Sequence, residues 1–337
     1  MRGVEGMNEY RGKHAPSQPW AIASSAYMPV RRGRHRKKAR FHRLRVFLLC
    51  FLVLLILSYP FLESRIIFAD FFGQFVDRHT IKSTQLPEKA NNLKIVYVSD
   101  IHWGFWFSDN DLRTLIKKIN NLNPSIVIFG GDYATDQSSA ISFFRKLKDM
   151  PKILTQYGVF GVLGDSDRGE TLYEQTQLYD LTSAMHAAEI KPLVNQVEPI
   201  PIGERSANTY IYLAGADDSL NGSPDLNAIA GKVRSDDFVV FIAHNPSIIN
   251  DAQRTPCNNG SLRWIDVGLF GHTHGGQMTL FSDLLHIAED VQDNRRKSGW
   301  FTENQAELLI SRGVGTSVVP FRLFCFPQIH CIDITCK

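Results

Sequence analysis

The chain has 337 residues, 44% hydrophobic and 21% charged, a composition that indicates a folded protein of one or two domains and excludes a wholly disordered one. The formal net charge of +3 conceals an asymmetry, because residues 1–45 carry 12 Lys/Arg and 2 Asp/Glu. Subtracting these from totals of 37 and 34 leaves 25 basic and 32 acidic residues elsewhere. The positive charge is therefore concentrated at the N-terminus.

The basic arm leads into an uninterrupted apolar segment. We predict that residues 1–45 form a basic, disordered tail, since 1–30 are polar with scattered Pro, Gly and Ser. Residues 46–62 contain 17 positions without a charge, dominated by Leu, Val, Ile and Phe. This length lies at the short end of the range for a transmembrane helix, and no small-x-small cleavage site follows it closely. We therefore predict an uncleaved transmembrane signal anchor over 46–62.

The charge distribution also predicts an orientation in the membrane. The positive-inside rule places residues 1–45 in the cytoplasm and residues from about 63 onward on the outer side of a single-pass cell-membrane protein. One alternative is a nucleic-acid-binding arm followed by a buried core helix, but a core helix would show a polar face. We therefore expect no nucleic-acid partner. A twin-arginine export signal is a second alternative, although Arg31 and Arg32 lie far from the apolar run.

The remaining elements alternate in type along the chain. Residues 63–92 are predicted to form a connector with a short helix at Phe68–Val76, before a folded domain over 93–337. Short apolar runs predict strands at residues 94–98, 126–129, 159–163, 210–214, 238–243 and 265–270. Helical periodicity predicts helices at 109–120 (capped by Ser108 or Asp109), at 138–147, and from the third strand through Tyr179. This alternation is typical of α/β layers around central β-sheet.

Metal-ligand side chains recur where these predicted strands end. The set is Asp100, His102, Asp132, Asp165, Asp167, His244, His272 and His274. Active sites of layered α/β folds form beyond the carboxyl ends of strands. Each residue alone could serve as a turn residue, a helix cap or a buried histidine, but turn chemistry does not explain five such clusters. Mixed carboxylate and imidazole ligands suit Mn²⁺, Fe or Zn²⁺, and the set suffices for two ions.

In order, these motifs resemble those of the calcineurin-like metallophosphoesterases. They are Asp100-x-His102, Gly130-Gly131-Asp132, Gly164-Asp165-Ser166-Asp167, Ala243-His244-Asn245-Pro246 and Gly271-His272-Thr273-His274-Gly275-Gly276-Gln277. The tail Ser311–Ser317, with Pro320, Phe321 and Arg322 beyond it, is similar to the bacterial membrane-associated branch of that family. The resemblance covers roughly residues 93–335. It implies a four-layer αββα sandwich with two mixed β-sheets, here preceded by one N-terminal transmembrane helix.

The resemblance also implies a site and a reaction. Two divalent ions are expected (Mn, Fe or Zn, with Mn favoured in vitro), and a hydroxide bridging them would attack a phosphoester or pyrophosphate. By position, Asp100, His102 and His274 would hold one ion, His244, His272 and Asp165 the other, and Asp132 would bridge both.

The chain departs from the family at Asp165 and Ser166, where the family has Asn and then His. Asp165 can still coordinate, and as an anion it should bind its ion more tightly while weakening it as a Lewis acid. The family histidine helps to protonate or stabilise the leaving oxygen, and a serine hydroxyl donates a proton less readily. Asp167 or Arg168 is an alternative source of that group. We therefore expect a preference for pyrophosphate or activated ester linkages over simple alkyl diesters.

Anchoring suggests a substrate at the membrane: a phospholipid, a lipid-linked sugar pyrophosphate or a cell-envelope phosphodiester. One alternative is a UDP-2,3-diacylglucosamine pyrophosphatase of lipid A synthesis, which suits the leaving-group argument but not the predicted topology. An alternative from another class is a catalytically weak metal-binding interaction protein. The run Trp103, Phe105, Trp106 and Phe107 would either touch acyl chains at the rim of the site or pack under the next helix.

The cysteines give little functional information. Cys50 lies in the predicted membrane span, and no CxxC occurs, which argues against a cysteine-rich zinc site. Cys325, Cys331 and Cys336 could form a disulfide in an oxidising compartment, although ordinary buried thiols are the simpler interpretation.

Overall fold

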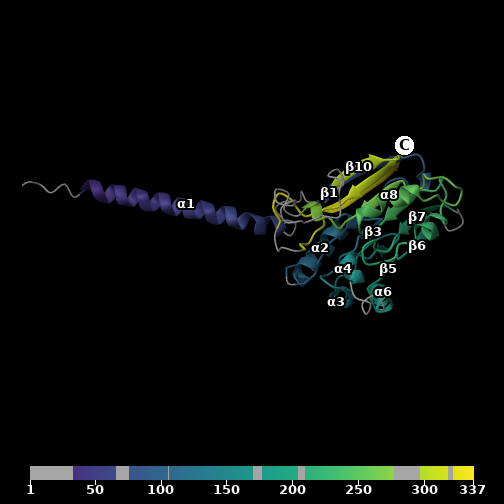
Figure 1. Cartoon of the computed structure of the whole chain (residues 1–337), viewed down its shortest axis with the longest axis horizontal. Coiled ribbons are helices and arrows are strands. Elements are labelled where there is room, and N and C mark those ends of the chain that lie inside the picture. The colour runs from purple at the N-terminus through teal and green to yellow at the C-terminus, as the bar shows by residue number, and fades with distance from the viewer. Residues whose placement is uncertain are drawn as a thin grey trace, which may run out of the picture. The chain divides into compact units, whose positions relative to one another are not determined.

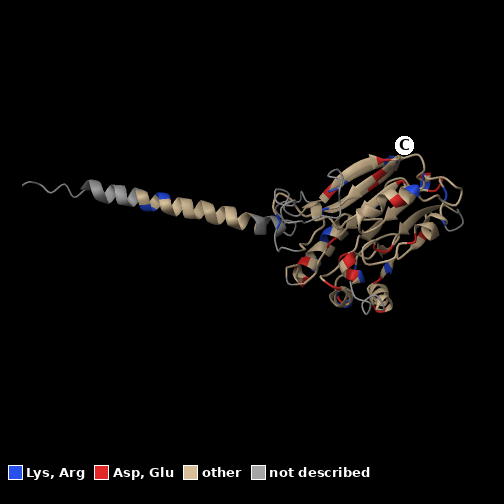
Figure 2. Cartoon of the chain, in the orientation of Figure 1, with Lys and Arg blue, Asp and Glu red and all other residues tan. Residues whose placement is uncertain are grey.

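The computed structural model describes residues 33–65, 76–104, 106–169, 177–203, 209–276, 297–317 and 322–337. Within these ranges the N-terminal element is a single long helix, α1 (Gly33–Arg65). Its window His42–Tyr59 has a mean hydropathy of 1.8 and no buried part, so it is long and apolar enough to cross a membrane. In Figure 2, the coloured part of α1 begins with basic residues, and an uncharged stretch follows them.

The helix begins earlier than the sequence indicates. Residues 33–45, predicted as part of a disordered tail, are helical, and only residues 1–32 of that tail lie outside the described part. Arg, Lys and Leu are all good helix formers, so the helix of the apolar segment extends through the basic residues before it.

The folded domain contains two six-stranded β-sheets. In the first sheet the strand order is β1 (Val76–Ser83), β12 (Ile329–Cys336), β2 (Leu93–Val98), β3 (Ile126–Phe129), β4 (Val159–Gly161) and β5 (Ile190–Pro192). In the second it is β10 (Gly299–Glu303), β11 (Ala306–Ile310), β9 (Val267–Phe270), β8 (Val239–Ile242), β7 (Tyr210–Gly215) and β6 (Gln196–Pro201). Both sheets are mixed, because β12 runs antiparallel to β2, β10 to β11 and β6 to β7.

Helices flank the sheets, and most are short. Those described in the folded domain are α2 (Asp109–Asn121), α3 (Gln137–Lys148), α4 (Asp165–Arg168), α6 (Leu178–Ala187), α7 (Leu226–Ala230) and α8 (Ile249–Arg254), with 3₁₀ turns η3 (Glu88–Ala90), η5 (Pro246–Ile248) and η6 (His274–Gly276). Helices α2, α3 and α6 lie on one side of the first sheet in Figure 1. Of the two predicted caps for α2, the structure selects Ser108.

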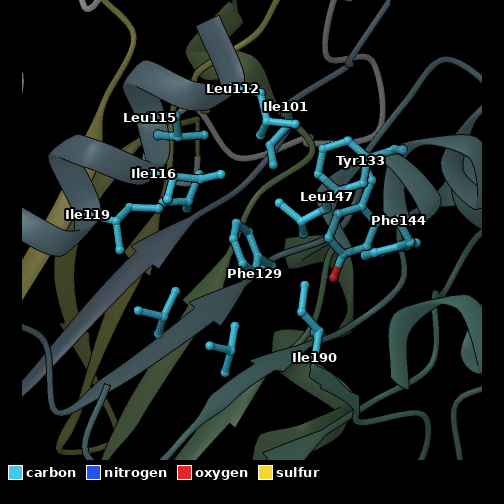
Figure 3. Close-up of a cluster of buried hydrophobic side chains, with 14 of the residues drawn as sticks. Ile101, Leu112, Leu115, Ile116, Ile119, Phe129, Tyr133, Phe144, Leu147 and Ile190 are labelled. Atoms are coloured by element: carbon cyan, nitrogen blue, oxygen red, sulfur yellow. The ribbon is translucent and has the colours of Figure 1, made fainter. Parts of the chain in front are cut away.

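The side chains of the strands alternate between two cores, which defines the layers. Val96 and Val98 of β2 pack against α2 and α3, whereas Ile95 and Tyr97 face the second sheet. In the second sheet, Val239 of β8 contacts the helices on the far side. Figure 3 shows the first of these cores, where side chains of α2 project toward the strand that carries Phe129. The order of layers is therefore α-β-β-α, as predicted.

Several predicted boundaries differ from the structure. The segment predicted as a connector contains β1, so the first sheet begins at Val76 rather than near residue 93. Of the helix predicted at Phe68–Val76, all but Val76 lies outside the described residues, and Val76 begins a strand. Of the helix predicted to run from the third strand through Tyr179, residues 165–168 form α4 and Tyr179 lies in α6. Gly169, with a φ of 70°, ends α4, and residues 170–176 lie outside the described part. The five cysteines are free thiols.

Candidate metal centre

The predicted ligands come together at one edge of the two sheets. Asp100, Asp132 and Asp165 follow the parallel strands β2, β3 and β4 of the first sheet. His244 and His272 follow the parallel strands β8 and β9 of the second. Because parallel strands end at the same edge and the sheets are stacked, loops from both converge there.

The side chains form two groups of candidate metal ligands. One contains Asp100, His102, Asp132 and His274, and the other contains Asp165, His244 and His272; within each, the ligand atoms lie within 4.8 Å of one another. Asp132 connects the groups, since its Oδ2 lies 3.4 Å from Nε2 of His102 and 3.4 Å from Nε2 of His244.

The four residues of the first ligand group have a backbone conformation with positive φ angles. Asp100, His102, Asp132 and His274 have φ angles of 53°, 46°, 54° and 49°. Residues other than glycine rarely adopt this left-handed conformation, and it concentrates at functional sites, where surrounding structure maintains the strain. The conformation brings Nε2 of His102 to 3.0 Å from Nε2 of His274. Two imidazole nitrogens at that separation can bind a common partner.

The second group has a defined histidine tautomer. The Nδ1 of His244 lies 2.7 Å from the carbonyl oxygen of Gly130, and it must carry the proton because a carbonyl only accepts. The lone pair on Nε2 of a neutral His244 then faces Asp165, whose Oδ1 is 3.2 Å away. The same Oδ1 lies 2.9 Å from Nδ1 of His272. An imidazole fixed by a backbone carbonyl is the usual arrangement of a histidine that ligates a metal.

Unpartnered atoms show that the residues fit metal ions. The Oδ2 of Asp100 and the Nε2 of His244 are buried and have no hydrogen-bond partner among the described residues. A buried polar atom without a partner carries a large desolvation cost, and a cation would remove that cost here. The facing imidazoles of His102 and His274 support the same conclusion.

The surroundings of His244 and His274 shift the pKa values of these two histidines in opposite directions. Burial lowers the pKa of His244, but the neighbouring carboxylates of Asp132 and Asp165 outweigh it and hold this pKa well above its usual value. By contrast, burial, His102 and the Arg322 guanidinium lower the pKa of His274 well below its usual value, so it remains neutral. Neutral imidazole is the form that binds metals.

Comparison with known proteins identifies the family. The sequence profile of the calcineurin-like phosphoesterases matches residues 93–276, more than half of the chain. The chain belongs to the calcineurin-like phosphoesterase family. It is therefore a phosphoesterase hydrolase with a phosphate-containing substrate, and the family and the Asp/His cluster indicate divalent metal ions.

The relatives agree with this membership. The chain is 26% identical over 251 residues to the uncharacterized metallophosphoesterase YkuE of Bacillus subtilis, covering 74% of this chain and 82% of that one. It is 27% identical over 256 residues to the uncharacterized metallophosphoesterase Cj0846 of Campylobacter jejuni, with coverage of 75% and 62%. It is 26% identical over 202 residues to a Danio rerio transmembrane protein with metallophosphoesterase domain, covering 58% of this chain but 43% of that protein.

Ser166, which replaces the family histidine, and its neighbour Asp167 have clear hydrogen-bond partners. Ser166 donates its hydroxyl to Oδ1 of Asp132 at 2.6 Å and lies 3.0 Å from the carbonyl of Ala134. Asp167 has no exposed surface and accepts the N–H groups of Asp132, Tyr133 and Gly164 at 2.8–3.0 Å.

Arg168 lies away from the ligands. Its side chain is buried and pairs with Asp217, with Nε to Oδ1 at 3.2 Å. It is not among the described residues that line the cavity above the ligands. Like Asp167, it therefore occupies a supporting position in this structure.

The cavity above the ligands has a volume of about 520 Å³. Sequence analysis missed four residues that line it: Thr135, Asp136, Gly169 and Asn221. Asn221 could have been found, since it follows Asp217 and Asp218 just beyond the predicted strand 210–214. Thr135 and Asp136 follow Asp132 closely, and Ser317, which also lines the cavity, belongs to the tail motif Ser311–Ser317.

The buried side chain of Arg322 lies next to the ring of His274. Arg322 has no exposed surface, and its Nε donates to the carbonyl of Gly315 at 2.9 Å while Nη2 donates to that of Arg312 at 2.8 Å. Its Nη2 also lies 3.5 Å from Nδ1 of His274. Arg322 thus fixes the loop after β11 beneath the first ligand group. Its motif neighbours Pro320 and Phe321 lie outside the described residues, as does Gln277.

The aromatic run after His102 divides between core and surface. Phe107 is buried in the core beneath α2, and Trp103 is partly buried with its Nε1 donating to Asp109 at 3.1 Å. Trp106 is 50% exposed. Phe105 lies outside the described residues. The packing interpretation therefore holds for Phe107 and Trp103, and contact of Trp106 with acyl chains stays a prediction.

Proposed function

We propose that this protein is a membrane-anchored phosphohydrolase in which seven side chains hold two divalent cations. The observation that carries the proposal is the position of Asp132, whose Oδ2 lies 3.4 Å from one imidazole of each ligand group. One site would consist of Asp100, His102, Asp132 and His274, and the other of Asp132, Asp165, His244 and His272. A shared carboxylate suits cations about 3.5–4 Å apart.

The bound cations would supply Lewis-acid polarisation of the phosphoryl group and a water of lowered pKa. The chain's own contribution is to orient the ligands before substrate arrives. Ser166 holds Oδ1 of Asp132, and the N–H of His272 donates to Oδ1 of Asp100 at 2.8 Å. Gly130 fixes the ring of His244. Groups oriented in this way need no reorganisation during the reaction.

The donor set also guides the choice of metal. Three carboxylates and four imidazoles suit Mn²⁺, Fe or Zn²⁺ better than Ca²⁺, which prefers oxygen ligands. We expect Mn²⁺ to support activity in vitro.

Asp132→Asn is the variant that tests hydrolysis. With Mn²⁺ added, the wild-type protein should hydrolyse p-nitrophenyl phosphoesters, and the variant should lose more than about 10²-fold in kcat/KM because the shared carboxylate loses its charge. Asp251→Asn, at an exposed position on α8, is the matched control and should retain full activity. A wild-type protein that binds Mn²⁺ without turnover would instead support a metal-binding interaction protein.

The preference for good leaving groups rests on Ser166. Its hydroxyl donates to Asp132, and Asp167 and Arg168 are buried and are not among the described residues that line the cavity. No side chain among these three is placed to protonate a leaving oxygen. We therefore propose that the enzyme favours phosphoanhydrides and activated esters, whose leaving groups need little protonation.

Ser166→His tests this preference. A restored proton donor should accelerate esters with poor alkoxide leaving groups by about 10²–10⁴-fold and leave good leaving groups nearly unchanged. Equal gains for both would contradict the idea. Ser166→Ala is the companion variant, because it removes the bond to Asp132 without adding an acid and should weaken Mn²⁺ binding by about 10–100-fold.

Membrane anchoring is the second part of the proposal. It is supported by the apolar window of α1 and by the zebrafish relative, whose name describes a transmembrane protein. We propose that residues 1–45 lie in the cytoplasm and the folded domain on the outer side, with a lipid-linked or cell-envelope phosphate compound as substrate.

Protease treatment of intact cells tests this topology on the full chain. Added protease should cleave the folded domain and spare an epitope tag at the N-terminus, and the protein should resist extraction from membranes at high pH. Protection of the folded domain would reverse the proposed orientation. Release into the soluble fraction would remove the anchor.

A further inference from the structure

Asn221 lies in a loop that contacts Asp165, a member of the second ligand group. The loop connects β7 to α7, and Asn221 lines the same cavity as Asp132, Asp165 and His272. Its Nδ2 donates to the backbone carbonyl oxygen of Asp165 at 3.0 Å. The side-chain amide is therefore anchored to the backbone of a candidate metal ligand while it faces the cavity.

Two buried aspartates fix this loop. Oδ2 of Asp218 accepts the N–H groups of Leu220 at 2.8 Å and Asn221 at 2.6 Å. Oδ2 of Asp217 accepts the N–H of Ser223 at 2.9 Å, and its Oδ1 pairs with Arg168. Both aspartates are buried. The position of Asn221 is thus established by the protein itself before any ligand binds.

The loop also approaches itself closely at Gly222. A Cβ at this position would lie 2.6 Å from the carbonyl oxygen of Asp218 and 2.7 Å from the carboxylate of Asp217. Contacts that short do not occur, so the loop requires glycine beside Asn221. This requirement is a further sign that the loop holds Asn221 in one position.

The chemistry of the cavity calls for a neutral donor. Asp132 and Asp165 would bind cations, but Asp136 also lines the cavity, is not a candidate metal ligand, and would repel an anionic phosphoryl group. The hydroxyl groups of Thr135 and Ser166 donate to Asp136 and Asp132. A carboxamide has two N–H donors, and only one N–H of Asn221 has an acceptor among the described residues.

We infer that Asn221 donates its second amide N–H to a phosphoryl oxygen of the substrate. The inference rests on the proposed phosphohydrolase function and adds a substrate-contacting residue to it. The neutral amide compensates for Asp165, which as an anion accepts hydrogen bonds but donates none. Asn221 is thereby a specificity residue for the phosphoryl group rather than a metal ligand.

The test compares Asn221→Ala and Asn221→Asp with Asn227→Ala, a matched control at an exposed position on α7. The first readout is calorimetric binding of inorganic phosphate to the full chain loaded with Mn²⁺. A hydrogen bond to a charged group predicts that Asn221→Ala weakens phosphate binding by about 10–100-fold, and Asn221→Asp should weaken it further through repulsion. Asn227→Ala should bind phosphate as the wild type does.

The second readout separates substrate contact from structural damage. On bis(p-nitrophenyl) phosphate, Asn221→Ala should lower kcat/KM by about the same factor, while Mn²⁺ affinity and melting temperature stay at wild-type values. Unchanged phosphate affinity would overturn the inference, and so would a parallel loss of Mn²⁺ affinity. If the wild type binds phosphate but hydrolyses no ester, the proposed function fails while the phosphate measurement still decides the role of Asn221.

Discussion

The two oxygens of Asp132 have different partners. Oδ2 faces an imidazole of each ligand group, whereas Oδ1 accepts the hydroxyl proton of Ser166 at 2.6 Å. The sequence shows only that Ser166 stands where the family has a histidine. In the structure it also acts as a donor that orients the central carboxylate. Ser166 and Asp132 are 34 positions apart in the sequence, and their contact depends on the paths of two loops. The spacing of residues along the sequence does not specify those paths.

Asp266 provides a prediction at the residue scale, away from the metal centre. Burial raises its pKa to about 7, although it accepts the N–H of Val239 at 2.9 Å. In the unfolded chain this pKa is near 3.8. Between about pH 4 and 7, Asp266 is therefore protonated in the folded protein and ionised in the unfolded chain. The free energy of unfolding falls as pH rises through this window, because ionised Asp266 is more stable in the unfolded chain. Above about pH 7 this loss of stability is constant.

Asp266→Asn should remove this penalty, because an amide keeps an acceptor for Val239 without ionising. We expect the variant to gain stability relative to wild type as pH rises from 4 to 7, by at most about 4 kcal/mol. Urea unfolding at several pH values measures the gain. Asp251→Asn, at an exposed acid on α8, is the control and should show no such trend. A parallel pH dependence in wild type and Asp266→Asn would contradict the assignment.

At the scale of helices and strands, the sequence predicted an element correctly where the residues that stabilise it lie in one continuous segment. Helix α2 has its apolar residues on one face and its cap in the preceding residue, and both are visible in the sequence. Strands β1 and β12 were missed because their stability comes from each other. Asp77 and His330, which interact across these strands at 3.0 Å, are separated by 253 positions.

The cap of α2 gives a prediction for an element. Ser108 accepts the N–H of Asp111, and the carboxylate of Asp111 accepts the N–H of Ser108 at 2.8 Å. Ser108→Ala should cost about 1 kcal/mol and lower the melting temperature by about 2–4 °C. Ser142→Ala, at an exposed site inside α3, is the control and should change stability by less than about 0.5 kcal/mol. Equal shifts for both variants would show that the cap contributes little.

At the scale of the whole molecule, the candidate metal ligands come from both sheets. Asp100, His102, Asp132 and Asp165 come from loops of the first sheet, and His244, His272 and His274 from loops of the second. The sequence predicted these residues and their grouping, since strand ends and motif order are local features. It did not predict that Asn221 lines the cavity or that Arg322 contacts His274, because these contacts arise from loops without a repeating pattern.

Removing metal should therefore destabilise the whole domain. At 100-fold excess over its Kd, a ligand that binds only the folded state adds about 2.7 kcal/mol. We expect Mn²⁺ to raise the melting temperature of the purified full chain and a chelator to lower it. Asp132→Asn should respond less to both, since it weakens both sites. A melting temperature independent of Mn²⁺ in the wild type would count against metal binding to the folded state.

Strand β12 gives the molecule an obligatory order of assembly. It ends at Cys336, one residue from the C-terminus, and it pairs with β1 on one side and β2 on the other. Until it is synthesised, β1 has no partner in the sheet and β2 has an open edge. The first sheet therefore closes only after the ribosome has synthesised β12, 253 positions after β1. A chain that lacks residues 329–336 should leave one edge of β1 and one edge of β2 unpaired, and unpaired strand edges promote aggregation.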